Sequence, residues 1–117
     1  MAMYRKVYGE DATGWPRGES AMFDVMIEQL FAEIWTRPGL DIPVRRLITL
    51  GVLAAQAKYD VLELQFLRAL NTGELTAHQV REIVIHLIAY VGYPSSGALL
   101  RAGENAIEFF ATQGEQS

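Results

Sequence analysis

The stretch from Phe31 to Leu50 constrains the fold more than any other part of this chain, because it combines a helical pattern, a forced turn and a second helical pattern. Pro38 cannot continue a helix, since its ring fixes φ and removes a backbone donor, and Gly39 can adopt the positive φ of a tight turn. Asp41 and Pro43 then stand where a new helix would begin, the acid near its positive end and the proline in its first turn. The stretch therefore predicts two helices joined by a short turn.

Apolar residues recur at spacings of three and four over most of the chain, which is typical of helices packed on one face. The expected helices are residues 20–34, 43–57, 60–70, 76–91 and 94–111. Ser20 is expected to be the N-cap of the first of these helices, and no segment shows the alternation of a strand. We therefore expect an all-α fold of about five helices, with an irregular arm at residues 1–18, one domain at residues 19–112 and a flexible tail at residues 113–117.

Composition narrows the classes of partner. Half of the 117 residues are hydrophobic, so we expect some apolar surface to be buried between subunits of a homo-oligomer. The net charge is −4, with acids and bases interspersed, and without a basic patch nucleic acid is not an expected partner.

Tyr4, Tyr8 and Trp15 could anchor the N-terminal arm onto the body or onto a neighbour.

The chain has no cysteine, which excludes disulfides, thiolate metal sites and cysteine nucleophiles. With only two histidines and no metal-ligand spacing, a metal site is not expected either. No apolar run approaches the roughly 20 residues of a membrane span, and the N-terminus has no apolar signal region. These features favour a cytoplasmic protein without a membrane partner.

Three residues of the fourth expected helix could carry chemistry. Glu82, His86 and Tyr90 stand at i, i+4 and i+8, and therefore on one helix face. An acid, a proton shuttle near neutral pH and a phenol would then lie in a line. The alternative is structural, with His86 a core histidine bonded to Glu82 and Tyr90 a core aromatic.

Arg45 and Arg46 follow the turn in an otherwise apolar segment, and cations in such surroundings need anionic partners. A ligand could supply the anion. Alternatively, Glu33 or Asp41 could form an ion pair with one arginine across the turn and hold the two helices together.

Two blocks of the chain resemble the carboxymuconolactone decarboxylase family. FAEIWTRPGL, followed by Arg45 and LIT, matches the family pattern F-x-D/E-I/V-W-S/T-R-P-G-L, then R, then L-I/V-T. REIVIHLIAYVGYP resembles E-V-L-L-H/Q-x-x-x-Y-x-G-x-P and supplies Glu82, His86 and Tyr90. The resemblance runs from about residue 20 to about residue 110.

The resemblance implies an alkylhydroperoxidase D-like helical domain that assembles as a trimer or hexamer. It implies a lyase that removes CO₂ from a small carboxylated lactone or related acid without a cofactor. Arg45 would hold the anionic substrate and its developing oxyanion, and His86, positioned by Glu82, would deliver the proton. Trp35 and Tyr90 would line the substrate pocket, although Trp35 could instead be a core or lid residue.

The chain also departs from the family. Gln65 stands where the family commonly has a histidine; it can hydrogen-bond a substrate but cannot shuttle a proton near pH 7. Arg46 occupies a position that is usually small and polar, so we expect it to form an ion pair or an interface. The cysteine pair of the related thiol peroxidases matches Lys58 and Val61, which excludes that activity. A non-catalytic, oligomeric protein that binds a small acid is therefore the alternative function.

Overall fold

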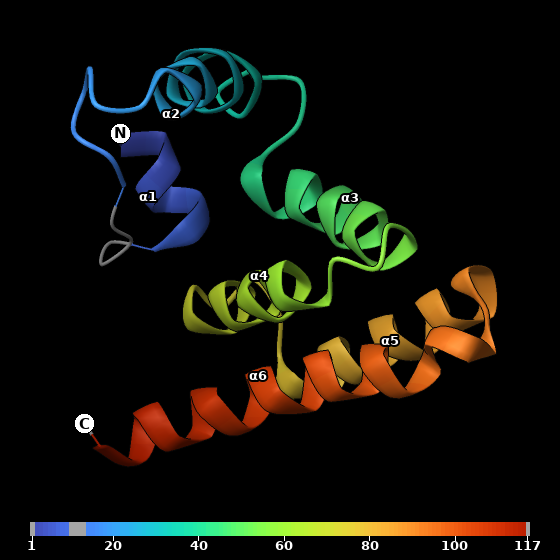
Figure 1. Cartoon of the computed structure of the whole chain (residues 1–117). Helices are drawn as coiled ribbons and strands as arrows, with labels where there is room; N and C mark the ends of the chain where they lie inside the picture. Colours follow the sequence, from blue (N-terminus) through green and yellow to red (C-terminus); the bar gives the residue numbers. More distant parts are fainter. Residues whose placement is uncertain (1, 10–13, 117) are drawn as a thin grey trace. The chain divides into compact units, whose positions relative to one another are not determined.

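The computed structural model describes residues 2–9 and 14–116, with side chains up to residue 114. Helices follow one another along the chain (Figure 1). In order they are α1 (Ala2–Tyr8), α2 (Ala21–Met26), the π-helix η1 (Ile27–Ile34), α3 (Ile42–Ala55), α4 (Tyr59–Asn71), α5 (Ala77–Val91), the 3₁₀ turn η2 (Tyr93–Ser95) and α6 (Ser96–Gln116). The described residues contain no strand, so the predicted all-α fold is confirmed.

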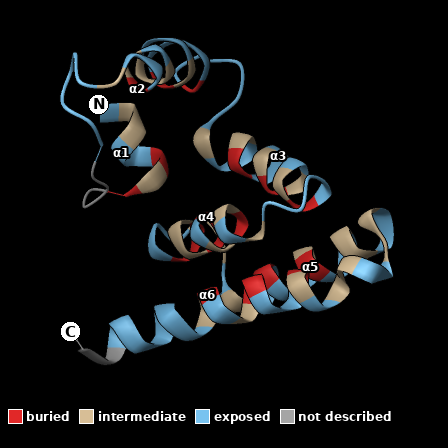
Figure 2. Cartoon of the chain, viewed as in Figure 1, coloured by how far each residue is buried: buried red, intermediate tan, exposed pale blue. Residues whose placement is uncertain are grey.

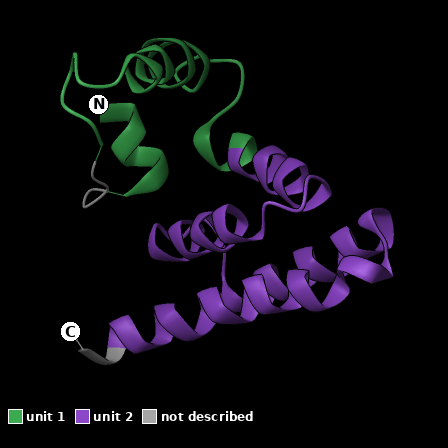
Figure 3. Ribbon diagram, viewed as in Figure 1, with its two compact units in different colours: residues 1–45 green, residues 46–117 purple. Residues whose placement is uncertain are grey.

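The chain divides into two compact units, residues 1–45 and residues 46–117 (Figure 3). The division falls between Arg45 and Arg46, inside α3. Each unit has its own cluster of buried apolar residues, and each is described by itself below.

The helix predicted at residues 20–34 is present in the first unit, as α2 continued by η1. Ser20 is its N-cap, as predicted, and the Ser20 hydroxyl accepts a hydrogen bond from the Phe23 N–H at 3.2 Å. The Trp35 N–H bonds to the Leu30 carbonyl, five residues back, which is the spacing of a π-helix.

An aromatic cluster holds the first unit together. Phe31 is buried, and the rings of Tyr4 and Tyr8 pack against it with centroid distances of 5.1 and 5.6 Å. The prediction of an irregular arm is therefore wrong for α1, because tertiary packing of its tyrosines stabilises a helix too short to stand alone. Trp15, by contrast, is 57% exposed and is not part of this buried cluster. Residues 10–13 of the predicted arm lie outside the described residues.

The second unit is built around α6, which packs along both α4 and α5 (Figure 1). Each helix of this unit carries buried residues (Figure 2). The core consists of Leu50, Ala54, Leu62, Phe66, Leu70, Val80, Val84, Leu99, Ala102 and Ala106. Among the described residues, no helix is long and apolar enough to cross a membrane.

Local chemistry sets the ends of α5. Thr76 and Gln79 form a capping box at its start, each side chain bonding to the other's backbone N–H. Gly92 ends the helix at φ 114°, a conformation that favours glycine. The last helix begins at Ser96 and runs to Gln116 rather than to residue 111, so residues 113–116 of the predicted tail are helical, and residue 117 lies outside the described residues.

Candidate functional site

His86 and Tyr90 lie together on the surface of α5. Their ring centroids are 5.0 Å apart with an interplanar angle of 42°, as the spacing of one helical turn predicts. Both side chains are exposed, Tyr90 to 80%. The structural alternative, in which both are core residues, is therefore wrong.

These two rings line a pocket of about 470 Å³ in the second unit. Gly51 and Ala55 of α3 form its other side, where their small size leaves room, and Leu87 and Val91 complete the lining. A Cβ on Gly51 would lie 4.0 Å from the Leu87 side chain. The pocket therefore places an imidazole and a phenol, both able to exchange protons, beside an apolar wall.

Glu82 does not orient His86 in this structure. Its Oε1 atom lies 4.0 Å from Nε2 of His78, and both side chains are well exposed. No hydrogen bond between Glu82 and His86 is present in the described part of the chain. Because His78 and His86 lie one turn to either side of Glu82, the carboxylate is within reach of either imidazole by rotation. The side chain of His78 is exposed.

Arg45 braces the turn that Pro38 and Gly39 create. Its Nε donates to the Leu40 carbonyl at 3.2 Å and its Nη2 donates to the Arg37 carbonyl at 3.1 Å. The start of α3 is capped beside it, since Asp41 Oδ1 accepts a hydrogen bond from the Val44 N–H at 3.1 Å. Arg45 thus belongs to the first unit and bonds to backbone carbonyls there.

Arg46, by contrast, is a buried residue of the second unit, exposed to only 1%. Its Nε lies 2.9 Å from Glu74 Oε2, and its Nη1 donates to Gln65 Oε1. Thr72 Oγ1 donates to the same Glu74 oxygen at 2.5 Å. The predicted ion pair of Arg46 is confirmed, with the carboxylate of Glu74 as its partner within the second unit.

Gln65 is as buried as Arg46 and accepts its hydrogen bond. It does not line the pocket of His86 and Tyr90. The structure thus places Gln65 in an internal polar cluster with Arg46 and Glu74. Sequence reasoning missed Glu74, which lies 28 residues from Arg46 and carries no local signal.

Trp35 is a core residue of the first unit, stacked on Phe31 with a centroid distance of 6.4 Å. Of the residues to which the family resemblance gives a role, the structure brings His86 and Tyr90 together in one pocket. Within the described ranges, no three histidine or acidic side chains are grouped so that they could hold a metal ion.

The family model and the curated relatives that match this chain point to the same family. The sequence model of the carboxymuconolactone decarboxylase family matches residues 20–105. This range includes Arg45, His86 and Tyr90. The chain is 32% identical over 78 residues to the 4-carboxymuconolactone decarboxylase of Acinetobacter baylyi, covering 67% of this chain and 58% of the relative. It is 33% identical over 92 residues to the nitrosuccinic acid decarboxylase of Metarhizium robertsii, covering 79% of this chain and 64% of the relative.

The chain thus spans about three fifths of the length of these curated relatives. No solved structure matches it significantly.

Proposed function

The chain belongs to the carboxymuconolactone decarboxylase family, and on that premise we propose that it is a decarboxylase that acts without a cofactor on a small carboxylated lactone or a related acid. The observation that carries the proposal is the pocket in which His86 and Tyr90 stand beside an apolar wall. The pocket lies within the region that the family shares. A proton donor next to a surface suited to a carbon skeleton is what a decarboxylation of this kind requires.

The two named acids suggest why no cofactor is needed. When a C–CO₂⁻ bond breaks, its electron pair must be delocalised before a proton replaces CO₂ on carbon. In a carboxymuconolactone the pair can pass through the C=C bond to the lactone carbonyl, and in nitrosuccinic acid it can pass to the nitro group. Each acid therefore carries its own electron sink, and the protein need only bind the anion, stabilise the developing oxyanion and supply the proton.

Within this proposal, His86 delivers the proton to the substrate carbon. Tyr90, whose ring lies against that of His86, can donate its hydroxyl to the developing oxyanion. Glu82 is assigned a positioning role, which requires its side chain to turn from His78 towards His86. Arg45 is assigned the contact with a substrate carboxylate by its match to the family arginine, not by geometry.

We also propose that the chain works as a homo-oligomer, either a trimer or a hexamer. Leu47, Ile48 and Val52 leave an apolar face of α3 exposed, and contact with a second copy would remove that face from water.

A second candidate function is binding of a small acid without catalysis. It is favoured by Gln65, which stands where the family commonly has a histidine and is buried against Arg46. Without a proton-transfer group at that position, the chain would retain the fold and the pocket but lose the reaction.

One experiment separates the two functions. The full chain is incubated separately with carboxymuconolactone and with nitrosuccinic acid, and released CO₂ is measured against a control without protein. A decarboxylase releases CO₂ well above that control from at least one acid. Calorimetric binding of the same acids without CO₂ release would instead establish the non-catalytic function.

A further inference from the structure

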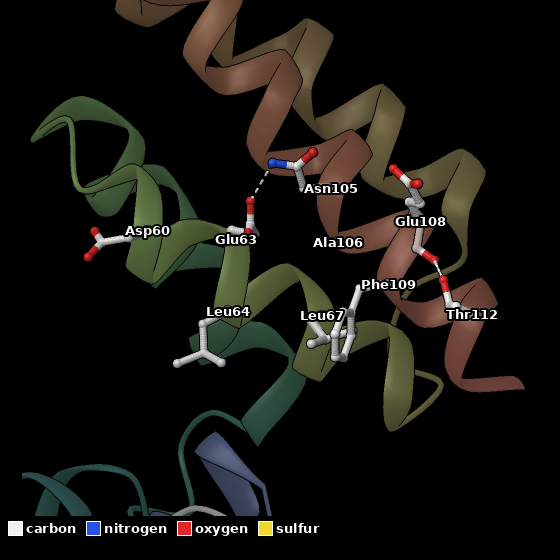
Figure 4. Close-up of a pocket in the computed structure, with 9 residues that line it drawn as sticks. All are labelled: Asp60, Glu63, Leu64, Leu67, Asn105, Ala106, Glu108, Phe109 and Thr112. Carbon is white, nitrogen blue, oxygen red and sulfur yellow. Dashed lines mark hydrogen bonds between the residues drawn. The ribbon is translucent and has the colours of Figure 1, made fainter. Parts of the chain in front are cut away.

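A second hollow, of about 600 Å³, lies between α4 and α6 in the second unit (Figure 4). None of its lining residues belongs to the pocket of His86 and Tyr90. Its volume falls within the range of about 300–1,000 Å³ that is usual for small-molecule pockets. The proposed function makes no use of this hollow.

The floor of the hollow is apolar. Leu64 and Leu67 of α4 and Ala106 and Phe109 of α6 form it. Leu64 and Phe109 are about half exposed, at 45% and 54%, although each is large and apolar. An apolar ligand body resting on them would remove this surface from water.

The rim of the hollow is acidic. Asp60 and Glu63 come from α4 and Glu108 comes from α6, and no lysine or arginine is among the lining residues. The Nδ2 atom of Asn105 donates to Glu63 Oε1 at 2.9 Å (Figure 4), which fixes this carboxylate between the two helices. None of the three acids forms an ion pair with another described residue.

One cation, Arg101, lies in the lining of a neighbouring hollow. That hollow, of about 260 Å³, also includes Asp60 and Glu63, but Arg101 forms no ion pair with a described residue. The negative charge of the rim is therefore not neutralised by a direct contact. Such a rim repels a carboxylate substrate and attracts a cation.

From the apolar floor and the acidic rim together we propose that this hollow binds a hydrophobic amine, meaning a protonated ammonium group on an aryl or alkyl body. The ammonium group contacts Glu63 and Asp60, and the apolar body covers Leu64 and Phe109. The site is separate from the proposed catalytic pocket, and its ligand has the opposite charge to the proposed substrate.

The test uses three probes of similar size and shape, titrated into the full chain at pH 7 and followed by calorimetry and by NMR shifts. They are 2-phenylethylammonium, the neutral 2-phenylethanol and the anionic 3-phenylpropanoate. The ammonium probe should bind on the order of tenfold more tightly than the alcohol, because contact between an ammonium group and a partly exposed carboxylate contributes a binding free energy of that order. The anion should bind more weakly than the alcohol at this site.

Two variants locate the site. Glu63→Gln keeps an oxygen that can accept the Asn105 bond but removes the charge, so it should weaken binding of the ammonium probe about tenfold and leave the alcohol unchanged. Phe109→Ala should weaken both probes. Glu19→Gln removes an exposed carboxylate of the first unit and should change neither, and His86→Ala should also leave binding of the ammonium probe unchanged.

Equal affinity for the three probes, or an unchanged ammonium affinity in a folded Glu63→Gln protein, would overturn the proposal. A change of oligomeric state would also overturn it. If Phe109→Ala remains folded by circular dichroism but light scattering shows a smaller species than the wild type, a second copy of the chain covers this face.

Discussion

Arg46 and Gln65 are joined inside the second unit, where the guanidinium group donates a hydrogen bond to the side-chain oxygen of Gln65 and both residues are 1% exposed. Glu74 completes this cluster from the loop after α4. A buried cation of this kind depends on its bonded partners. The residue at the family's histidine position thus has a structural partner in this chain.

Glu74→Gln tests the dependence of Arg46 on its carboxylate. The substitution keeps the shape of the side chain but removes the charge 2.9 Å from the buried guanidinium. Because breaking a buried ion pair commonly costs about 3–5 kcal/mol, we expect a loss of up to about that size in the free energy of unfolding, measured with urea at pH 7. Glu104→Gln, in the half-exposed pair with Arg81, is the matched control and should cost less than about 1 kcal/mol. Equal losses in the two variants would contradict this account.

Local chemistry made much of the fold predictable. The capping box of Thr76 and Gln79 and the glycine at position 92 act on their own neighbours, so the sequence predicts where α5 begins and ends. The same holds for the N-cap at Ser20. The helix α1 was missed because it depends on tyrosine rings packed against Phe31, which lies more than twenty residues away along the chain.

The part of the candidate site that lies on a single helix was also predictable, because it too depends on neighbouring residues. One helical turn separates His86 from Tyr90, so their contact follows from spacing on a single helix. The ion-pair partner of Arg46 could not be predicted from spacing, since Glu74 lies 28 residues along the chain and approaches Arg46 only in the folded second unit. Rotation of an exposed side chain decides whether Glu82 faces His78 or His86, and spacing allows both.

A pH dependence follows from the pair of Arg81 and Glu104. The hydrogen bond from Arg81, aided by its positive charge, holds the pKa of Glu104 below its usual value. The folded state therefore gains stability above the unfolded pKa of a glutamate, about 4.3, and loses it as the pH falls through the lowered folded pKa. Arg81→Gln should accordingly lower Tm slightly at pH 7, and this difference from the wild type should shrink at pH 3. A difference of equal size at both pH values would show that the ion pair is not its cause.

Arg45→Ala is expected to weaken binding of an anionic ligand such as carboxymuconolactone, as measured by calorimetry. Arg45→Lys should restore the affinity only in part, because a point charge replaces a planar group that bonds the carbonyls of Arg37 and Leu40. Arg17→Ala, which removes an exposed arginine of the same unit, should have no effect. Unchanged affinity in a folded Arg45→Ala protein would remove Arg45 from the proposed site.

The apolar face of α3 predicts self-association. Light scattering of the full chain at micromolar concentration should give a mass that is a multiple of the monomer, three or six times by our proposal. Leu47→Glu combined with Ile48→Glu should reduce that mass, since charges on a contact face oppose burial. Met22→Glu, a change at an exposed residue of α2, is the control and should not. A wild-type monomer would contradict the proposed oligomer.

The rate of CO₂ release by His86→Ala, compared with wild type and with His78→Ala, tests the central claim most directly. The two histidines lie on one helix and are both exposed, but only His86 lines the pocket with Tyr90. With the acid that the wild type decarboxylates, His86→Ala should be slower by about 10²–10⁴, the usual contribution of a general acid or base, and His78→Ala should keep close to the wild-type rate. Wild-type rates in a folded His86→Ala protein, or equal losses in the two variants, would contradict the assignment of the proton to His86.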